Sequence, residues 1–336
     1  MQALVIHGKQ DLREENIDLP ALAPGKVRLR MSFGGICGSD LHYYHEGANG
    51  AFVVREPLIP GHEMSGVVDE DPSGQWPLGT PVTLHPATFG QSQTGIEDKP
   101  HLWPNGAYLG SASTWPHTQG GMSQFLDVDA SMLRALPDTL PLKRAALAEP
   151  LAVGLHGIEV AGGVDQKRVL VCGAGPIGLL AAAAALARGA KEVCITDILE
   201  GPLSRAKILG VHRTIQVDRE ELPEEAFDVV LECTGVPASI NKAILAVRRA
   251  GVIAQIGMMP AAPQPIALAS LIAKEVQLRG CFRFNNEIDE AIALLAANSN
   301  FDHVITHVLP AADAQQAFAI AKDAEVSGKV LIELWK

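Results

Sequence analysis

The sequence predicts an α/β fold in which a doubly wound parallel sheet is joined to a second, β-rich domain. Residues 1 to about 145 hold many short strands separated by Pro and Gly turns, which is typical of a partly closed barrel. From Arg144 the pattern turns helical and then alternates strand and helix, as in a parallel doubly wound sheet. A chain of 336 residues exceeds one ordinary core, so two domains are expected.

The individual elements follow from short apolar runs between turn residues. We expect a first strand at 1–7, cut short by Gly8, and further strands at 27–31 and 81–84. The second half is expected to hold strands at 169–172, 193–196, 229–232, 252–256 and 276–278, with a last strand at 328–334. Helices are expected at 179–188 and 289–297.

A glycine-rich turn joins the strand that ends at Cys172 to an alanine-rich helix. It reads Gly173-Ala174-Gly175-Pro176-Ile177-Gly178, and this order of strand, turn and helix places a pyrophosphate at the helix N-terminus. The next strand ends in Asp197, nineteen residues after Gly178, where an acid for a ribose 2′-hydroxyl is expected. Asp197 repels a 2′-phosphate, so NAD is favoured over NADP, although Arg205 lies near enough in sequence to reach a phosphate.

The expected cofactor-binding residues are therefore Gly173, Gly175, Pro176, Ile177, Gly178, Asp197 and Thr234. The alternative interpretation is a glycine turn that binds nothing.

A second motif offers three different metal ligands on glycine-flanked stretches. Cys37 lies in the segment Gly35 to His42, and His62 and Glu63 follow Gly61. Zinc accepts thiolate, imidazole and carboxylate, and a catalytic zinc keeps one position open. Ser39 and His42 follow Cys37 closely, so a proton could leave the metal along this loop. The alternative is a buried cysteine and a strand histidine without function.

Composition excludes several other classes of protein. Charged residues make up 19% and hydrophobic residues 47%, as in a soluble globular chain. The net charge of −11 argues against nucleic acid as a partner, because that partner requires basic patches. Residues 1–7 do not read as a signal peptide, and no apolar run is long enough for a membrane span, so the cytoplasm is the expected location.

Cysteine usage fits the same location. Cys172, Cys194, Cys233 and Cys281 lie in or at the end of apolar runs and are expected to be small buried side chains. An odd count of five without C-x-x-C spacing indicates a reducing compartment and no disulfide framework.

Together these motifs resemble one family, the zinc-dependent medium-chain dehydrogenases. The resemblance rests on the Cys37 and Gly61-His62-Glu63 segments, on Glu149-Pro150-Leu151-Ala152-Val153, on the glycine turn and on the closing Gly328-Lys329-Val330. Residues 37–44 and 149–153 are similar to the polyol and sugar-acid branch, and residues 279–284 to its sugar-acid members. The resemblance implies a GroES-like catalytic domain of residues 1–145 and 285–336 and a Rossmann domain of residues 146–284, with the active site between them.

The resemblance also implies roles for the site residues. Zinc is expected on Cys37, His62 and Glu63, with Glu149 either a fourth, exchangeable ligand or the group that orders water at the metal. A Glu before Pro can instead cap a turn. The substrate hydroxyl is expected to pass its proton through Ser39 to His42 and its hydride to the nicotinamide.

The substrate is expected to be a small molecule. Arg283 could pair with a substrate carboxylate or hydroxyls, or form a structural ion pair. The expected pocket walls are Tyr43, Trp115, His117 and Phe284, which could equally be core residues. The resemblance favours a sugar acid such as L-idonate, oxidised at C5, and a neutral polyol is the alternative.

One departure from the family pattern concerns the lobe at residues 86–110. Most members carry four closely spaced cysteines there for a structural zinc, whereas this segment contains none. Four thiolate or imidazole ligands are required, so we expect one zinc per chain and a lobe held by Trp103, Tyr108 and Trp115. A homo-oligomer, dimer or tetramer, is expected. A zinc-free reductase or nicotinamide sensor is the remaining alternative, which the complete ligand set at Cys37, His62 and Glu63 disfavours.

Overall fold

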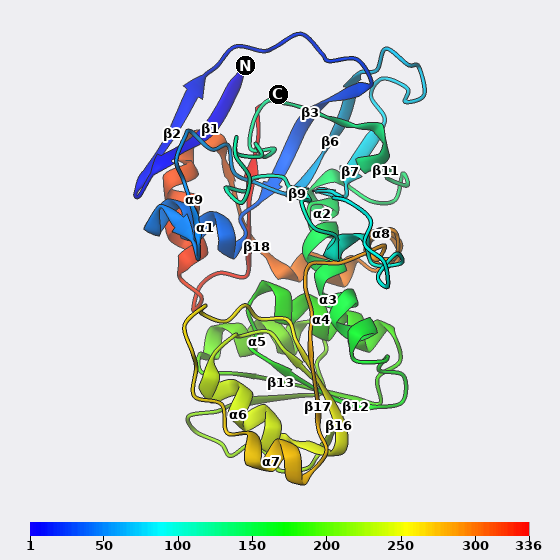
Figure 1. Cartoon of the computed structure of the whole chain (residues 1–336), viewed down its shortest axis with the longest axis vertical. Coiled ribbons are helices and arrows are strands. Elements are labelled where there is room, and N and C mark those ends of the chain that lie inside the picture. Colours follow the sequence, from blue (N-terminus) through cyan, green and yellow to red (C-terminus); the bar gives the residue numbers. More distant parts are fainter. Residues whose placement is uncertain (336) are drawn as a thin grey trace.

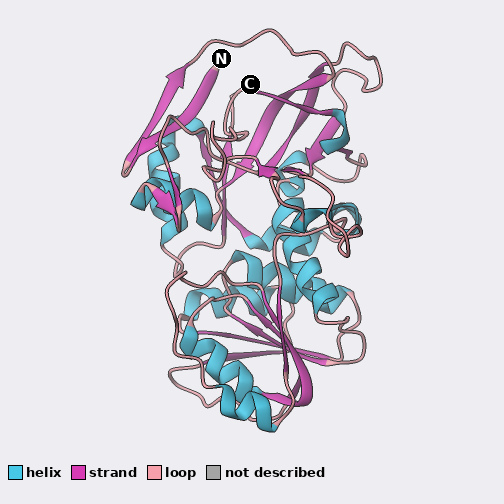
Figure 2. Ribbon diagram, viewed as in Figure 1, coloured by secondary structure: helices cyan, strands magenta, loops and turns pink. Residues whose placement is uncertain are grey.

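The computed structural model describes residues 1–335, and its two large sheets lie at opposite ends of an elongated molecule (Figure 1). Both chain ends lie at the end of the molecule that holds the first sheet, whereas the middle of the chain builds the second (Figure 1). Helices surround the second sheet, and the first is mostly strands and loops (Figure 2). None of the helices in residues 1–335 is long and apolar enough to cross a bilayer.

The first domain is built mainly from antiparallel strands. Its strands are β1 (Gln2–Gly8), β2 (Asp11–Asn16), β3 (Lys26–Gly35), β4 (Ala48–Asn49), β5 (Phe52–Val53), β6 (Glu63–Glu70), β7 (Pro81–Leu84), β8 (Ala87–Thr88), β9 (Ala107–Tyr108), β10 (Phe125–Asp129), β11 (Leu133–Ala135), β18 (Ile305–Pro310) and β19 (Lys329–Glu333). The main sheet has the order β11-β7-β6-β3-β19-β18, with β10 on β3. Its helices are α1 (Gly38–Glu46), α2 (Leu142–Ala145) and α9 (Ala314–Lys322), with short 3₁₀ turns at Pro100–Leu102, Ala130–Met132 and Ala311–Asp313. A further 3₁₀ turn at Ser299–Val304 packs into the core of the second domain.

The second domain is a six-stranded parallel sheet of order β14-β13-β12-β15-β16-β17. Its elements are α3 (Ala148–Val160), β12 (Arg168–Cys172), α4 (Pro176–Ala187), β13 (Glu192–Asp197), α5 (Glu200–Ile208), β14 (Arg213–Gln216), β15 (Phe227–Glu232), α6 (Pro237–Ala246), β16 (Val247–Gln255), α7 (Leu268–Ala273), β17 (Gln277–Gly280) and α8 (Ile288–Ala297). The winding reverses at β12, whose neighbours are β13 and β15. Ligands bind beyond the carboxyl ends of the strands at such a reversal.

The C-terminal strand returns to the first sheet. β19 pairs antiparallel with β3, which places Leu331 opposite Gly35, and parallel with β18. Its first residue, Lys329, is only 2% exposed. The last segment of the chain therefore delivers a buried cation to the interior of the first domain.

The predicted fold class is confirmed, and the predicted strands and helices of the second half are present to within a few residues. The domain boundaries stay a prediction. Several elements were not among the predicted ranges, and two of them have a clear physical reason. β14 was not predicted, because Arg213-Thr214-Ile215-Gln216 is a short, mostly polar edge strand. Residues 38–46, expected as a loop, form α1, which ends at Gly47 with φ 73°.

Candidate active site

Three potential metal ligands converge where α1 and β6 begin. The Sγ atom of Cys37, a ring nitrogen of His62 and a carboxylate oxygen of Glu63 all lie within 4.8 Å of one another. His62 and Glu63 are buried and Cys37 is half-buried. This is the one such convergence of three or more His, Cys, Asp or Glu side chains in residues 1–335.

Two glycines allow this approach. Gly61, next to His62, has φ +99°, a conformation that side chains disfavour. Gly35 lies opposite Glu63 in the β3–β6 register, and a Cβ atom at Gly35 would stand 2.1 Å from Oε2 of Glu63. The Glu63 carboxylate therefore occupies the space that any side chain at position 35 would take.

Asp40 ties the two ligand segments together. Its carboxylate accepts hydrogen bonds from the backbone N–H of Cys37 at 2.9 Å and of Gly61 at 3.2 Å. The first bond is one half of a capping box, because Cys37 is the N-cap of α1 and Asp40 is its third residue. Burial raises the pKa of Asp40. Asp40 was not predicted, although the spacing of a cap and an acid three residues later is a recognisable signal.

Glu63 is paired with Lys329 from the other end of the chain. The Nζ atom lies 2.6 Å from Oε1 as a hydrogen bond and 2.6 Å from Oε2 as an ion pair, with both side chains at most 2% exposed. Lys329 also donates to the Ile36 carbonyl at 3.0 Å. Burial disfavours the ammonium, but Glu63 outweighs this effect and raises the pKa of Lys329. The cation holds the Glu63 carboxylate in its buried place.

The donor set fits zinc. Nδ1 of His62 and Oε2 of Glu63 are buried and have no hydrogen-bond partner within residues 1–335, the Lys329 ion pair aside. Burial disfavours the charged form of His62, but Cys37 and Glu149 outweigh it and raise the pKa of His62 to about 10. A cluster that stabilises an extra positive charge in this way is suited to a divalent cation, and thiol, imidazole and carboxylate are zinc ligands.

The residues expected to bind the nucleotide gather at the carboxyl ends of β12 and β13. α4 begins at Pro176, directly after the turn, and a Cβ atom at Gly178 would stand 1.9 Å from the Gly173 carbonyl. Asp197, the last residue of β13, accepts from the backbone N–H of Ala174 at 2.8 Å. The methyl group of Thr234 lies 2.8 Å from where a Cβ of Gly173 would be, so Thr234 borders the same turn.

Comparison with known proteins agrees with this geometry. A model of the alcohol dehydrogenase GroES-like domain matches residues 23–138, and a zinc-binding dehydrogenase model matches residues 176–297. Sorbitol dehydrogenase from Macaca fascicularis is 36% identical over 337 residues, covering 95% of this chain and 92% of the relative. The human sorbitol dehydrogenase is 35% identical over the same shares of the two chains. The solved structure of L-idonate 5-dehydrogenase from Escherichia coli has a TM-score of 0.92 at 32% identity and covers 99% of this chain and 97% of that one.

The chain belongs to the zinc-dependent medium-chain dehydrogenases. Within this family it is a member of the polyol and sugar-acid branch, an oxidoreductase of alcohols or polyols. The cofactors of this family are zinc and NAD(H), and its substrates are small molecules.

The predicted proton path of this dehydrogenase runs along a helix. Ser39, in the first turn of α1, is half-buried next to Cys37, and His42 stands one turn later. The His42 side chain is 54% exposed, and its Nδ1 lies 3.2 Å from Oε1 of Glu46. Residues three apart share a helix face, so Ser39 and His42 lie on one face of α1, as the predicted path requires.

Glu149, in the first turn of α3, lies close enough to the cluster of Cys37, His62 and Glu63 to act on the charge of His62. Tyr108 donates a hydrogen bond of 2.5 Å to Oε1 of Glu149, and the Tyr108 ring lies edge-on to His62 at 5.3 Å. Burial raises the pKa of Glu149, and Glu63 adds to this while His62 opposes it. Burial together with Glu149 also holds the pKa of Tyr108 well above its usual range, so the phenol keeps its proton. Tyr108 had been predicted only as a packing residue.

Arg283 reaches the same place from the second domain. Its guanidinium carbon lies 4.0 Å from the centroid of the Tyr108 ring and 4.8 Å from that of Phe282. No group within residues 1–335 accepts a hydrogen bond from it. Burial lowers the pKa of Arg283, whereas Tyr108 and Glu149 act to raise it. Its φ of 51° is left-handed, which costs about 1–2 kcal/mol for a residue with a Cβ.

The other predicted wall residues do not gather in one place. Tyr43 and His117 contact residues 111–114 of the first domain, next to Trp115, whereas Phe284 packs near His85. Tyr43 is 1% exposed, and its hydroxyl accepts from the backbone N–H of Ala112 at 3.1 Å. Phe284 is 1% exposed against the His85 ring. His117 contacts the Arg55 N–H with Nε2 and the Thr114 carbonyl with Nδ1, and its neighbour Trp115 is 65% exposed.

The lobe at residues 86–110 is held without cysteine. The indole of Trp103 donates to the Ile96 carbonyl at 2.9 Å, and Tyr108 is buried. Trp115 is too exposed to hold the lobe, contrary to expectation. His101 instead packs edge-on to His156 of α3, with the ring centroids 4.8 Å apart.

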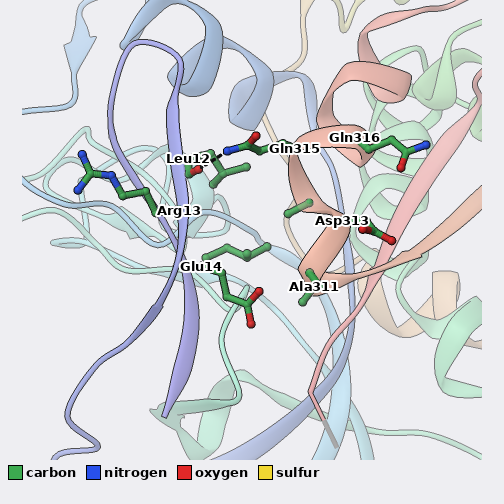
Figure 3. Close-up of a pocket in the computed structure, with 10 residues that line it drawn as sticks. Leu12, Arg13, Glu14, Ala311, Asp313, Gln315 and Gln316 are labelled. Atoms are coloured by element: carbon green, nitrogen blue, oxygen red, sulfur yellow. Dashed lines mark hydrogen bonds between the residues drawn. The ribbon is translucent and has the colours of Figure 1, made fainter.

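A surface hollow of about 620 Å³ lies elsewhere, between β2 and the start of α9 (Figure 3). Gln315 donates across it to the Leu12 carbonyl at 3.0 Å. Its lining includes none of the predicted site residues. The hollow is therefore separate from the candidate active site.

Proposed function

We propose that this dehydrogenase oxidises a secondary hydroxyl of a sugar acid, such as L-idonate, to a ketone, with NAD as hydride acceptor. The observation that carries the proposal is the Arg283 guanidinium, which is held over Tyr108 beside Glu149 and has no hydrogen-bond acceptor within residues 1–335. A guanidinium offers a planar fork of donors that matches a carboxylate. An unpaired fork beside the metal group supports a substrate that carries such a group.

The roles of the other residues follow from their positions. Zinc on Cys37, His62 and Glu63 would supply a Lewis acid that lowers the pKa of the reacting hydroxyl, and NAD would accept the hydride. Ser39 takes the proton from that hydroxyl and passes it towards His42, which exchanges it with solvent. Glu149, fixed by Tyr108, either adds a fourth ligand or orders water at the open position.

Preference for NAD over NADP rests on Asp197 and Arg205. The Asp197 carboxylate stands at the end of β13, where it would meet a ribose 2′-hydroxyl and repel a 2′-phosphate. Arg205 donates from its two terminal nitrogens to the carbonyls of Glu325 and Ala324. Because these donors are engaged, Arg205 is a poor candidate for holding a 2′-phosphate.

A neutral polyol is the second candidate. Sorbitol dehydrogenases of 35–36% identity support it, and the chemistry at the metal would be the same. In that case Arg283 would bind hydroxyl groups instead of a carboxylate.

Steady-state kinetics with L-idonate and with sorbitol separates the two candidates. Arg283→Leu should raise KM for L-idonate about 10- to 100-fold, the loss of a charge-assisted hydrogen-bond pair, while KM for sorbitol changes little. Arg283→Lys keeps the positive charge but lacks the planar fork of donors, so its KM for L-idonate should lie between those of wild type and Arg283→Leu. Equal losses on both substrates, or a wild-type preference for sorbitol, would favour the polyol.

We further propose one zinc per chain, a homo-oligomer and a cytoplasmic location. The single convergence of ligands within residues 1–335 supports the first, and five free cysteines support the last. The oligomer is supported by the outer edge of β17, which no strand of residues 1–335 pairs on that side. Four exposed apolar side chains on β17 and the neighbouring segments support it further: Leu268, Ile272, Leu278 and Phe282. Light scattering of wild type and Leu278→Glu tests this surface, because a charge on the edge should favour the monomer.

A further inference from the structure

The segment that carries Arg283 is fixed by contacts on its far side. It connects β17 to α8, and Arg283 takes a left-handed conformation within it. The next residue, Phe284, is 1% exposed and packs against the His85 ring with the centroids 4.5 Å apart. A residue in a disfavoured conformation keeps it only where its surroundings determine it. The contacts of residues 284–287 therefore decide where the guanidinium stands.

Asn285 is held by three hydrogen bonds. Its N–H donates to Oε2 of Glu287 at 2.6 Å, its carbonyl accepts from Nε2 of His85 at 2.9 Å, and its Nδ2 donates to the Asp98 carbonyl at 2.9 Å. Nδ1 of His85 faces the Ala87 N–H at 3.3 Å, so Nε2 carries the proton of the neutral ring. The backbone two residues after Arg283 is thus fixed on both its donor and its acceptor side.

Glu287 links this turn to the helix that carries Glu149. Its Oε1 lies 2.7 Å from Nδ1 of His156, and both side chains are nearly buried. Burial acts to raise the pKa of Glu287, but the bond to His156 and the Asn285 N–H outweigh it and lower that pKa, so the carboxylate is charged. His156 lies seven residues after Glu149 on α3, a spacing that puts both on one helix face. The Glu287 carboxylate therefore connects the segment that carries Arg283 to α3, the helix that also carries Glu149.

We propose that Glu287, with His156 and His85, is a positioning residue that sets the Arg283 guanidinium over Tyr108 for substrate recognition. The inference rests on the proposed function, since it assigns to Glu287 control over the residue that binds the substrate carboxylate. Within residues 1–335 Glu287 contacts Asn285 and His156 and does not contact Arg283, so it acts on the guanidinium through the backbone of Asn285. Loss of the Glu287 carboxylate should therefore weaken the binding of an acid substrate through Arg283 and leave the binding of a neutral polyol largely unchanged.

A mutant cycle on the zinc-loaded, full-length protein tests this. Glu287→Gln places an amide where one of the two donors points, so it should raise KM for L-idonate about 10-fold while kcat and the KM for sorbitol change less than about twofold. In an Arg283→Leu background the same change should have almost no further effect. Glu290→Gln is the matched control, because Glu290 lies in the first turn of α8, the helix that Glu287 precedes as N-cap, but pairs with Arg188.

Two further readouts keep the inference testable if Glu287→Gln folds poorly. His85→Phe keeps the ring packing on Phe284 but removes the donor to Asn285, and it should shift KM for L-idonate in the same direction. Hydrogen exchange of residues 281–287 should accelerate in both variants and not in Glu290→Gln.

The outcomes separate the two levels of the account. Suppose Arg283→Leu raises KM for L-idonate selectively, and Glu287→Gln raises it further by its full factor in that background. This result overturns the positioning role of Glu287 and leaves the proposed function standing. If Arg283→Leu leaves KM unchanged for L-idonate and for sorbitol, both the positioning role and the proposed function are overturned. Unchanged exchange of residues 281–287 overturns the positioning role by itself.

Discussion

Replacement of Lys329 by Met should destabilise the metal-free protein by about 3–5 kcal/mol. The ammonium lies 2.6 Å from the Glu63 carboxylate, and the two side chains are 2% and 1% exposed. Removing the cation leaves the Glu63 carboxylate buried without its ion-pair partner, which is the costly case for a buried ion pair. When zinc is bound to Glu63, the metal supplies positive charge, so the loss in free energy of unfolding should be clearly smaller.

Equilibrium urea unfolding, with chelator and with zinc, measures both losses. Lys26→Met is the control, because Lys26 pairs with Asp129 at 2.9 Å on the surface, with the side chains 37% and 44% exposed, and should cost about 0–1 kcal/mol. The same thermodynamic cycle requires folded Lys329→Met to bind zinc more tightly than wild type, which calorimetric titration can check. Equal losses in both forms, or a loss below about 1 kcal/mol without metal, would refute the reasoning.

Three other perturbations follow from the site and its surroundings. Burial and the neighbouring His156 lower the pKa of His101 to about 4, so the folded state disfavours its charged form. The contribution of neutral His101 to the free energy of unfolding should therefore be fully present above pH about 6.5 and decline as the pH falls towards 4. His101→Phe should flatten this decline in a series of Tm values against pH, and an unchanged slope would contradict the prediction. Asp197→Ser should raise the ratio of kcat/KM for NADP over NAD about tenfold or more, and an unaltered ratio would remove Asp197 from cofactor choice. Gly35→Ala should push the Glu63 carboxylate aside, costing about 1–3 kcal/mol and most of the bound zinc; a variant with full zinc would show that the site adapts.

Much of the second domain could be predicted because its signals are local. The apolar run to Cys172, the glycine turn and the alanine-rich helix adjoin one another in sequence, and Asp197 follows at a fixed spacing. The convergence of Cys37, His62 and Glu63 could be predicted for the same reason, since Cys37 adjoins Gly38 and the pair His62-Glu63 directly follows Gly61. α1 was missed because its capping signal uses Cys37 and Asp40 in place of the commoner Ser or Thr with Glu.

The supporting residues could not be predicted because their contacts depend on sheet register and domain packing. Lys329 meets Glu63 across 266 positions of the chain, and only the placement of β19 beside β3 brings them together. Tyr108 meets Arg283 from the other domain, and the hydrogen bond between His156 and Glu287 joins two helices. No periodicity in the sequence encodes such long-range pairs.

Metal content per chain, measured by mass spectrometry on protein purified without chelator, tests the central claim most directly. The account predicts one zinc per chain, lost in Cys37→Ser together with NAD-linked oxidation. Two zinc ions per chain would show that the cysteine-free lobe holds a metal after all. An active protein without zinc would contradict the assignment of Cys37, His62 and Glu63 as its catalytic metal ligands.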